Sequence, residues 1–200
     1  MKRTFVVAMT GASGAVYARR LIDVLTASGC DVHLSLSAAC VPVLKQELDL
    51  AVDPADFQPA LLVPGLADGR AGRVHYHHHA DLAAPIASGS FPTQGMIVCP
   101  CSMGTLSAIV HGTSANLIHR AADVHLKERR PLILVARETP LSLVHLENMT
   151  HAARAGATIL PAMPAFYHGV RGVEDLIDFV VARICDHLQV PHDLVRRWGE

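Results

Sequence analysis

Short, predominantly apolar runs alternate with helical stretches along most of this 200-residue chain. Strands read as continuous apolar runs when helices cover both faces of a parallel sheet, because no residue on either face meets water. The alternation therefore predicts an α/β fold: a single doubly wound parallel-sheet domain, Rossmann- or flavodoxin-like, over residues 1–200. The expected strands are 4–9, 32–36, 96–99, 132–136 and 157–160.

The stretches between these runs carry helix signals. Apolar residues recur at helical spacing over 14–28, and Gly29 follows the last of them. Thr139-Pro140 predicts an N-cap and a first-turn proline for a helix ending near Gly156. Residues 51–80 (approximately) are rich in Pro, Gly, Ala and Asp and predict an irregular excursion, with a C-terminal tail at about 190–200. Further helices are expected before about 48 and at 103–111, 116–128 and 173–188.

The composition excludes several classes of protein. Half of the residues are apolar and 18% are charged, which excludes a disordered chain. No apolar run approaches the roughly 20 residues of a membrane span, and a net charge of −1 gives no general attraction to nucleic acid. The start resembles a signal peptide only briefly, and a buried first strand fits better. Five scattered cysteines fit buried, reduced thiols in a cytoplasmic protein, and the charge-poor composition predicts burial between subunits.

Small and hydroxyl-bearing residues follow every predicted strand. The carboxyl ends of parallel strands meet at one edge of the sheet, where such folds bind ligands. Each segment alone fits ordinary turn chemistry, and the first is not the GxGxxG fingerprint. Together, with the Arg137/Glu138 pair, they favour a ligand that carries phosphate. The segments are 10–15, 35–39, 100–105, 137–140 and 161–168.

Arginine dominates the basic residues, with fourteen arginines against three lysines, and arginine suits rigid phosphate recognition. Arg183 shares its spacing with the apolar Phe179 and Val180, which predicts a buried arginine that needs an anionic partner. A structural salt bridge explains it equally well. Arg120, Asp123 and Lys127 are spaced to share one side of a helix.

Two other kinds of site fit poorly. His75, His77, His78 and His79 are dense, but they have no acidic or cysteine partner at ligand spacing, so we expect no functional metal. No GxSxG elbow follows a strand, which disfavours a serine hydrolase.

Longer motifs in a fixed order make the chain resemble the UbiX family of flavin prenyltransferases, formerly described as aromatic-acid decarboxylase subunits. The matching stretches cover nearly the whole chain outside about 51–80. They are GASGAVYA (11–18), ASGSFPTQGM (87–96), PCSMGTLSAIVHG (100–112), NLIHRAADVHLKERRPLILVARETPLS (116–142), HLENM (145–149), AGATILPAMPAFYHG (155–169) and DLVRRWG (193–199).

The resemblance implies an enzyme that transfers a dimethylallyl group from dimethylallyl phosphate to reduced FMN. It alkylates N5 and then closes a ring onto C6, giving prenylated FMN, the cofactor of UbiD-type decarboxylases. The implied FMN-binding residues are Gly11, Ala12, Ser13, Ser37, Ser102, Met103, Gly104, Thr105 and Arg137. The family often has lysine where this chain has Ala38, which leaves Ser37 intact.

The same resemblance implies the remaining site residues. Acid–base roles fall to Ser13, Glu47 and Glu138, and donors to the leaving phosphate make a divalent metal unnecessary. Arg120 and Lys127 are expected from a neighbouring subunit of a homododecamer built from trimers. The residues implied for dimethylallyl phosphate are Ser88, Gly89, Ser90, Arg120, Lys127, Tyr167, Arg183 and the tail residue Trp198.

Two rival functions remain open. An FMN-dependent decarboxylase acting on a peptidyl cysteine uses the same scaffold, but it relies on a catalytic histidine and its own clamp motifs. A non-catalytic flavin carrier needs the FMN residues but not Tyr167, Arg183 and Lys127 as a phosphate set.

Overall fold

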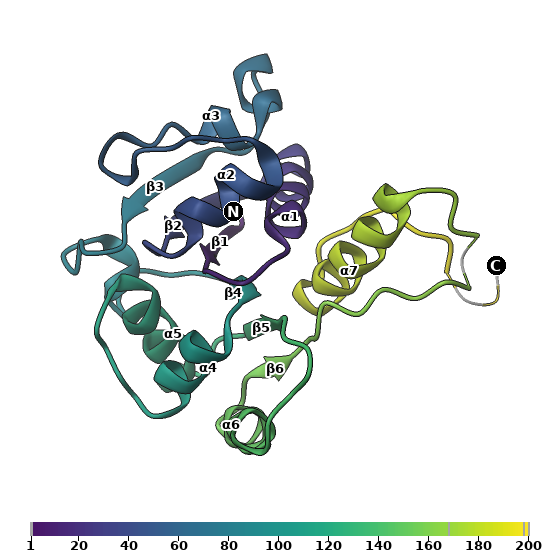
Figure 1. Cartoon of the computed structure of the whole chain (residues 1–200). Helices are drawn as coiled ribbons and strands as arrows, with labels where there is room; N and C mark the ends of the chain where they lie inside the picture. Colours follow the sequence, from purple (N-terminus) through teal and green to yellow (C-terminus); the bar gives the residue numbers. More distant parts are fainter. Residues whose placement is uncertain (1, 168, 198, 200) are drawn as a thin grey trace.

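Six parallel strands form one sheet in the order β3-β2-β1-β4-β5-β6 (Figure 1). The structure is a computed structural model that describes residues 2–167, 169–197 and 199. It confirms the predicted doubly wound parallel sheet, and the strand order reverses between β1 and β4. The strands are β1 (Thr4–Met9), β2 (Asp31–Leu36), β3 (Val74–His78), β4 (Gly95–Cys101), β5 (Leu132–Ala136) and β6 (Thr158–Ile159).

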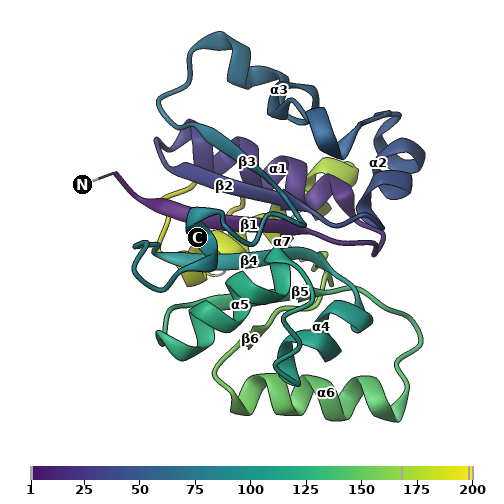
Figure 2. The ribbon, with the colours of Figure 1, turned by 90° about the vertical axis from the view of Figure 1, so that its left-hand side faces the viewer.

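Helices cover both faces of the sheet (Figure 2). One face carries α1 (Ala15–Ala27), α2 (Cys40–Leu48) and α7 (Val173–Leu188). The opposite face carries α4 (Met103–Val110), α5 (Leu117–Lys127) and α6 (Leu143–Arg154). The short helix α3 (Pro59–Leu62) and the single turns Pro54–Asp56, Pro64–Asp68 and Pro85–Ala87 lie in connecting segments.

Alternate residues of the central strands enter two separate apolar cores. Phe5, Val7 and Met9 of β1 pack beneath α1 and α7, whereas Val6 and Ala8 pack beneath α4 and α5. All five are fully buried, which explains why the run is apolar throughout. All five cysteines are free and buried, as predicted. Within the described residues, no helix is both long and apolar enough to cross a membrane.

The sheet contains one strand more than the sequence predicts. β3 lies inside the stretch expected to be irregular, and it carries His75, His77 and His78 on a strand instead of a polar loop. Its residues VHYHH lack an apolar run because β3 is an edge strand, paired only with β2. A strand with this polar pattern cannot be recognised from apolar runs in the sequence.

The start of α6 also differs from the prediction. The helix begins at Leu143, not after Thr139-Pro140, and Ser142 is its N-cap. Ser142 Oγ accepts the amide of His145, while the His145 ring accepts the amide of Ser142. This reciprocal capping box satisfies two amides that a proline-led start leaves to water.

Candidate active site

A cleft of about 450 Å³ opens at the carboxyl edge of the sheet, around the segments that follow β1, β5 and β6. Three of the five strand ends predicted to hold a ligand thus meet around one cavity, and its described lining includes no residue of the segments 35–39 and 100–105. Its described lining residues are Ser13, Gly14, Val16, Tyr17, Glu47, Arg137 and Ala162.

Glu47 reaches from α2 to the start of α1. Its carboxylate accepts hydrogen bonds from the Gly14 amide at 2.9 Å and the Ala15 amide at 2.8 Å. An internal carboxylate therefore occupies the start of α1, which follows the 10–15 segment predicted to favour a ligand that carries phosphate. Burial raises the pKa of Glu47, but hydrogen bonds from Ser13 and the two amides and the charge of Arg137 together lower it below its ordinary value. Glu47 is therefore ionised at neutral pH.

Arg137 supplies the positive charge of the cleft. Its backbone amide donates to Cys101 O at 3.3 Å, which fixes the start of the segment after β5. Within the described part of the chain, its guanidinium makes no hydrogen bond or ion pair. Arginine is well suited to bidentate contact with phosphate, so this exposed guanidinium is free to bind an anionic ligand.

Tyr17 forms part of the cleft wall, although it is not among the site residues predicted from the sequence. Its ring lies under the β1–α1 turn, where a Cβ added to Gly14 would stand 2.9 Å from the Tyr17 ring. Gly14 also adopts φ 113°, a conformation that favours glycine. Burial and the nearby Cys99 raise the pKa of Tyr17, against the charge of Arg137. The hydroxyl therefore stays protonated and can donate. Its only sequence signal is its place within GASGAVYA.

The turns after β1 and β4 are joined by Thr10, the first residue of the predicted 10–15 segment. Thr10 Oγ1 donates to Pro100 O at 2.7 Å and accepts the Ser102 amide at 2.9 Å. Ser102 then caps α4, accepting the Thr105 amide at 3.3 Å. A Cβ added to Gly104 would meet nothing within 4 Å, so the first turn of α4 is open to a ligand.

The turns after β1 and β2 also pack directly against each other. A Cβ on Gly11 would stand 2.6 Å from Ala39 Cβ, so packing within the chain already requires this glycine. Ala12 is buried beside it. Ser37 Oγ, at the end of β2, is buried and has no hydrogen-bond partner among the described residues. A buried hydroxyl without a partner is costly, which a ligand donor or acceptor at this position would relieve.

A second group of predicted residues lies on the α5 face. Arg120 Nε donates to Ala87 O at 3.1 Å and its Nη1 to Asp123 at 2.7 Å. Lys127 pairs with Glu128, and a Cβ on Gly89 would stand 2.9 Å from Lys127 Nζ. Ser88 Oγ and Ser90 Oγ are 2.8 Å apart in the same loop. The structure thus brings the 88–90 loop, Arg120 and Lys127 together.

Arg183 lies on α7, and the prediction that it is buried was wrong. Its side chain is 50% exposed and donates to Asp186 at 2.8 Å. The buried stripe of α7 runs through Val180, Ile184 and Leu188, and Arg183 falls beside that stripe instead of within it. The exposed Tyr167 packs edge-on against Phe179, with ring centroids 5.9 Å apart. Phe179 is one turn before Arg183, so Tyr167 and Arg183 share one side of the helix.

The other predicted residues are more dispersed. Glu138 is exposed, and its carboxylate accepts the amide of Thr139 at 3.0 Å. Met103 begins α4 and is nearly buried. Trp198 lies outside the described residues. In the part of the chain that is described, no group of three or more His, Cys, Asp or Glu side chains is arranged to hold a metal. The rings of His75 and His77 instead stack on His33.

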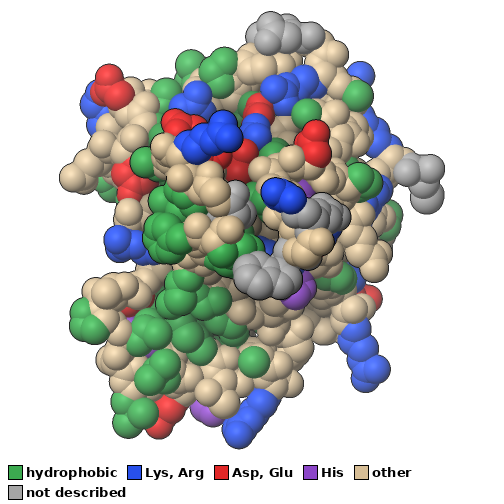
Figure 3. All heavy atoms as spheres, turned by 90° about the vertical axis from the view of Figure 1, so that its right-hand side faces the viewer, with side chains coloured by type: hydrophobic (Ala, Val, Ile, Leu, Met, Phe, Trp, Pro, Cys, Tyr) green, Lys and Arg blue, Asp and Glu red, His purple; other side chains and the backbone are tan. Residues whose placement is uncertain are grey.

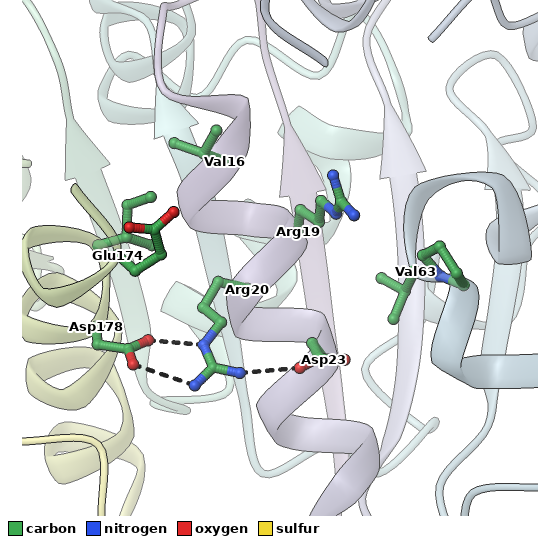
Figure 4. Close-up of a pocket in the computed structure, with 9 residues that line it drawn as sticks. Val16, Arg19, Arg20, Asp23, Val63, Glu174 and Asp178 are labelled. Atoms are coloured by element: carbon green, nitrogen blue, oxygen red, sulfur yellow. Dashed lines mark hydrogen bonds and ion pairs between the residues drawn. The ribbon is translucent and has the colours of Figure 1, made fainter. Parts of the chain in front are cut away.

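A wider hollow of about 510 Å³ adjoins the cleft (Figure 4). It lies between α1, α7 and the segment around Val63, and Val16 borders both hollows. Arg20 lies across it, donating to Asp178 at 2.6 and 3.1 Å and to Asp23 at 3.0 Å. Its central charges are therefore paired within the protein.

Comparison with known proteins identifies the class of protein to which this fold and cleft belong. The flavoprotein family model matches residues 1–185, so this is a flavoprotein-type α/β chain with its cleft at the strand ends. A curated relative, the flavin prenyltransferase UbiX of Pseudomonas aeruginosa, is 49% identical over 193 residues, covering 96% of this chain and 92% of the relative. The chain belongs to the UbiX family of flavin prenyltransferases.

Solved structures show the same relationship. The crystal structure of AnUbiX in complex with FMN and dimethylallyl pyrophosphate is 44% identical, with a TM-score of 0.87 over 100% of this chain and 99% of that one. The dodecameric FMN-dependent UbiX-like decarboxylase from Escherichia coli O157:H7 is 40% identical, with a TM-score of 0.85 over 98% of this chain and 99% of that one.

Proposed function

We propose that this protein transfers a dimethylallyl group from dimethylallyl phosphate to reduced FMN and so makes prenylated FMN. The observation that carries the proposal is the cleft itself, where an ionised Glu47 faces the free guanidinium of Arg137. Similarity over the whole chain to AnUbiX, whose structure contains FMN and dimethylallyl pyrophosphate, supports the same activity.

The residues at the strand ends fit a bound flavin nucleotide. Ser37 has a buried hydroxyl that needs a partner, Gly104 leaves the start of α4 open, and Arg137 offers unused donors. We assign the phosphate and ribityl oxygens to these groups, because hydroxyls, amides and a guanidinium are what such oxygens accept from. The FMN contacts are Gly11, Ala12, Ser13, Ser37, Ser102, Met103, Gly104, Thr105 and Arg137.

Acid–base chemistry falls to the carboxylate side of the cleft. Reduced FMN supplies the nucleophilic N5 and C6. The new N5–carbon bond forms as the carbon–oxygen bond to phosphate breaks, and the phosphate leaves with that electron pair. Glu47, ionised and bonded to Ser13, accepts the proton released by the flavin through the Ser13 hydroxyl. Glu138, on the segment after β5, is proposed as the second acid–base group.

The groups proposed for the prenyl phosphate lie on opposite faces of the sheet within one chain. Arg183 and Tyr167 lie beside α7 on one face, whereas Arg120, Lys127 and the 88–90 loop lie beside α5 on the other. One phosphate cannot touch both sets in a single chain. We infer that a neighbouring subunit presents Arg120 and Lys127, with Trp198 as a further contact.

An exposed apolar surface supports such assembly. Figure 3 shows apolar side chains gathered on one face of the molecule. Leu143 and Val144 of α6 are 70% and 61% exposed, and Met163 and Phe166 are similarly open. Apolar patches of this kind mark contacts between proteins. With a dodecameric relative of closely similar fold, we infer a homododecamer built from trimers, with active sites at subunit contacts.

The product defines the expected partner. Prenylated FMN serves UbiD-type decarboxylases, so we propose that this protein supplies one of them in the cytoplasm.

Two incubations separate the three candidate functions, one with the prenyl donor and one with a peptide that ends in cysteine. The protein is mixed with reduced FMN and dimethylallyl phosphate without oxygen, and the flavin mass is measured. A gain of one dimethylallyl unit is expected. Unmodified FMN after prolonged incubation contradicts the transferase and leaves the carrier. Loss of carbon dioxide from a peptide with a C-terminal cysteine identifies the decarboxylase instead.

A further inference from the structure

Asp186, near the end of α7, receives hydrogen bonds from three side chains at once. Its Oδ2 accepts from Arg183 Nη1 at 2.8 Å. Its Oδ1 accepts from His192 Nε2 at 3.1 Å and from Arg197 Nη2 at 3.2 Å. Burial raises the pKa of Asp186, but the hydrogen bonds from His192 and Arg197 lower it below its ordinary value. The group is therefore an ionised carboxylate held between two guanidinium groups.

Two of these donors belong to the segment that follows α7, residues 190–197. The His192 side chain is 3% exposed, and its Nδ1 accepts the amide of Leu194 at 3.4 Å. With Nδ1 as acceptor, the proton of the neutral ring lies on Nε2, which points to Asp186. Arg197 reaches the same oxygen from farther along the chain. Asp186 thus fastens this segment to the helix that carries Arg183.

We propose that Asp186 is a positioning residue: it orients Arg183 for the prenyl phosphate and couples that arginine to the 190–197 segment. The inference rests on the proposed prenyl transfer. A half-exposed arginine without a partner samples many rotamers and loses that freedom when it binds phosphate. The bond to Asp186 uses Nη1 alone and leaves Nε and Nη2 for an anion. Arg197 lies on the other oxygen, so the cluster keeps a net positive charge towards a phosphate.

The opposite role makes a distinct prediction. If Asp186 only competes with the phosphate for Arg183, removing its carboxylate frees the arginine and tightens substrate binding. If Asp186 positions Arg183, removing it weakens substrate binding. The direction of the change in KM therefore separates the two roles.

The first test compares Asp186→Ala and Asp186→Asn with Asp178→Asn. Asp178 lies on the same helix and forms an equally close arginine pair, but with Arg20 of α1. Steady-state rates are measured against dimethylallyl phosphate with saturating reduced FMN. We expect Asp186→Ala to raise KM about tenfold while kcat changes less than about threefold, because one charge-assisted contact is lost. Asp186→Asn keeps one acceptor oxygen and shows a smaller rise, and Asp178→Asn leaves KM unchanged.

The second test needs neither flavin nor turnover. Backbone hydrogen exchange over 190–197 is followed in the flavin-free protein by mass spectrometry. We expect faster exchange in both Asp186 variants and the wild-type rate in Asp178→Asn. If Asp186→Ala does not fold, the nearly isosteric Asp186→Asn carries both measurements.

The outcomes are separable. An unchanged or lower KM in the Asp186 variants overturns the positioning role, as does wild-type exchange over 190–197. If the wild-type protein itself makes no prenylated flavin, the proposed function fails, whereas the exchange measurement still decides whether Asp186 fastens the segment.

Discussion

Two adjoining hollows on either side of Val16 differ more in how their charges are satisfied than in their size. In the wider one, Arg20 bonds Asp178 and Asp23 directly (Figure 4). In the smaller cleft, backbone amides hold Glu47, and the guanidinium of Arg137 has no hydrogen bond within the described part of the chain. The smaller hollow therefore keeps the guanidinium of Arg137 available for a ligand, whereas the arginine that lies across the wider hollow is committed to two carboxylates.

The wider hollow serves the fold instead. Asp23 also pairs with Arg70 at 2.7 Å, and Arg70 Nε donates to Gly65 O at 3.1 Å. A chain of polar contacts thus joins α7, α1 and the segment before β3. Paired charges of this kind gain little from an incoming anion, because it must first displace an existing partner. The volume of a hollow is consequently a poor guide to function in this molecule.

The largest effect should come from the carboxylate of the cleft. We expect Glu47→Gln to slow prenyl transfer on the order of 100-fold or more, since general-base catalysis contributes about that much. Single-turnover formation of prenylated FMN, followed by mass, measures the loss. Glu174→Gln, on the wall of the wider hollow, is the matched control and should keep the wild-type rate. Equal losses in both variants would remove the functional distinction between the hollows.

The second largest effect should be a loss of FMN affinity when Arg137 is removed. We expect Arg137→Ala to weaken FMN binding by roughly 10- to 100-fold, the cost of one or two charge-assisted hydrogen bonds. Titration monitored by flavin fluorescence gives the affinity. Arg19→Ala removes an arginine from the wider hollow and should leave the affinity within about twofold. A normal FMN affinity in Arg137→Ala contradicts the assignment of Arg137 to the flavin.

The sequence predicts the central fold well because its strands are buried on both faces. β1, β4 and β5 are continuous apolar runs, and a parallel sheet covered on both faces buries every residue of such runs. β3 escapes the same reasoning, since an edge strand rich in histidine has no apolar pattern to detect. Ser142 was passed over for a similar reason: a proline after threonine is a strong local signal, but the capping box is formed only with His145.

The site is predictable to a different degree. The motifs contain Ser13 and Arg137, the family resemblance implies Glu47, and the structure brings these three together. The prediction that Arg183 is buried was wrong because it rested on spacing alone. The spacing places Arg183 next to the apolar residues of α7, but it does not show which side of the helix packs against the sheet. Tyr17 has no signal beyond its motif. The contact between Glu47 and the start of α1 joins residues more than thirty positions apart, and only the packing of α2 against α1 reveals it.

A smaller effect is expected from the paired charges of the wider hollow. Asp178→Asn removes the ion pair with Arg20, which is partly exposed, and should lower the free energy of unfolding by about 1 kcal/mol. Urea unfolding measures that change, and FMN affinity should stay at the wild-type value. A marked loss of FMN binding in Asp178→Asn would falsify the structural role given to this hollow.

The pH dependence of stability tests the cleft in the absence of any ligand. Because hydrogen bonds in the folded state lower the pKa of Glu47 against the effect of burial, its carboxylate stabilises the fold above the ordinary glutamate value of about 4.3. This stabilisation is lost as the pH falls through the lower folded value. Urea unfolding of wild type and Glu47→Gln should differ by less than about 1 kcal/mol near pH 7, the usual contribution of a carboxylate at a helix start. The difference should shrink as the pH falls through the lowered folded pKa of Glu47 and its side chain becomes neutral; a difference that does not change with pH shows that Glu47 does not act on α1 through its charge.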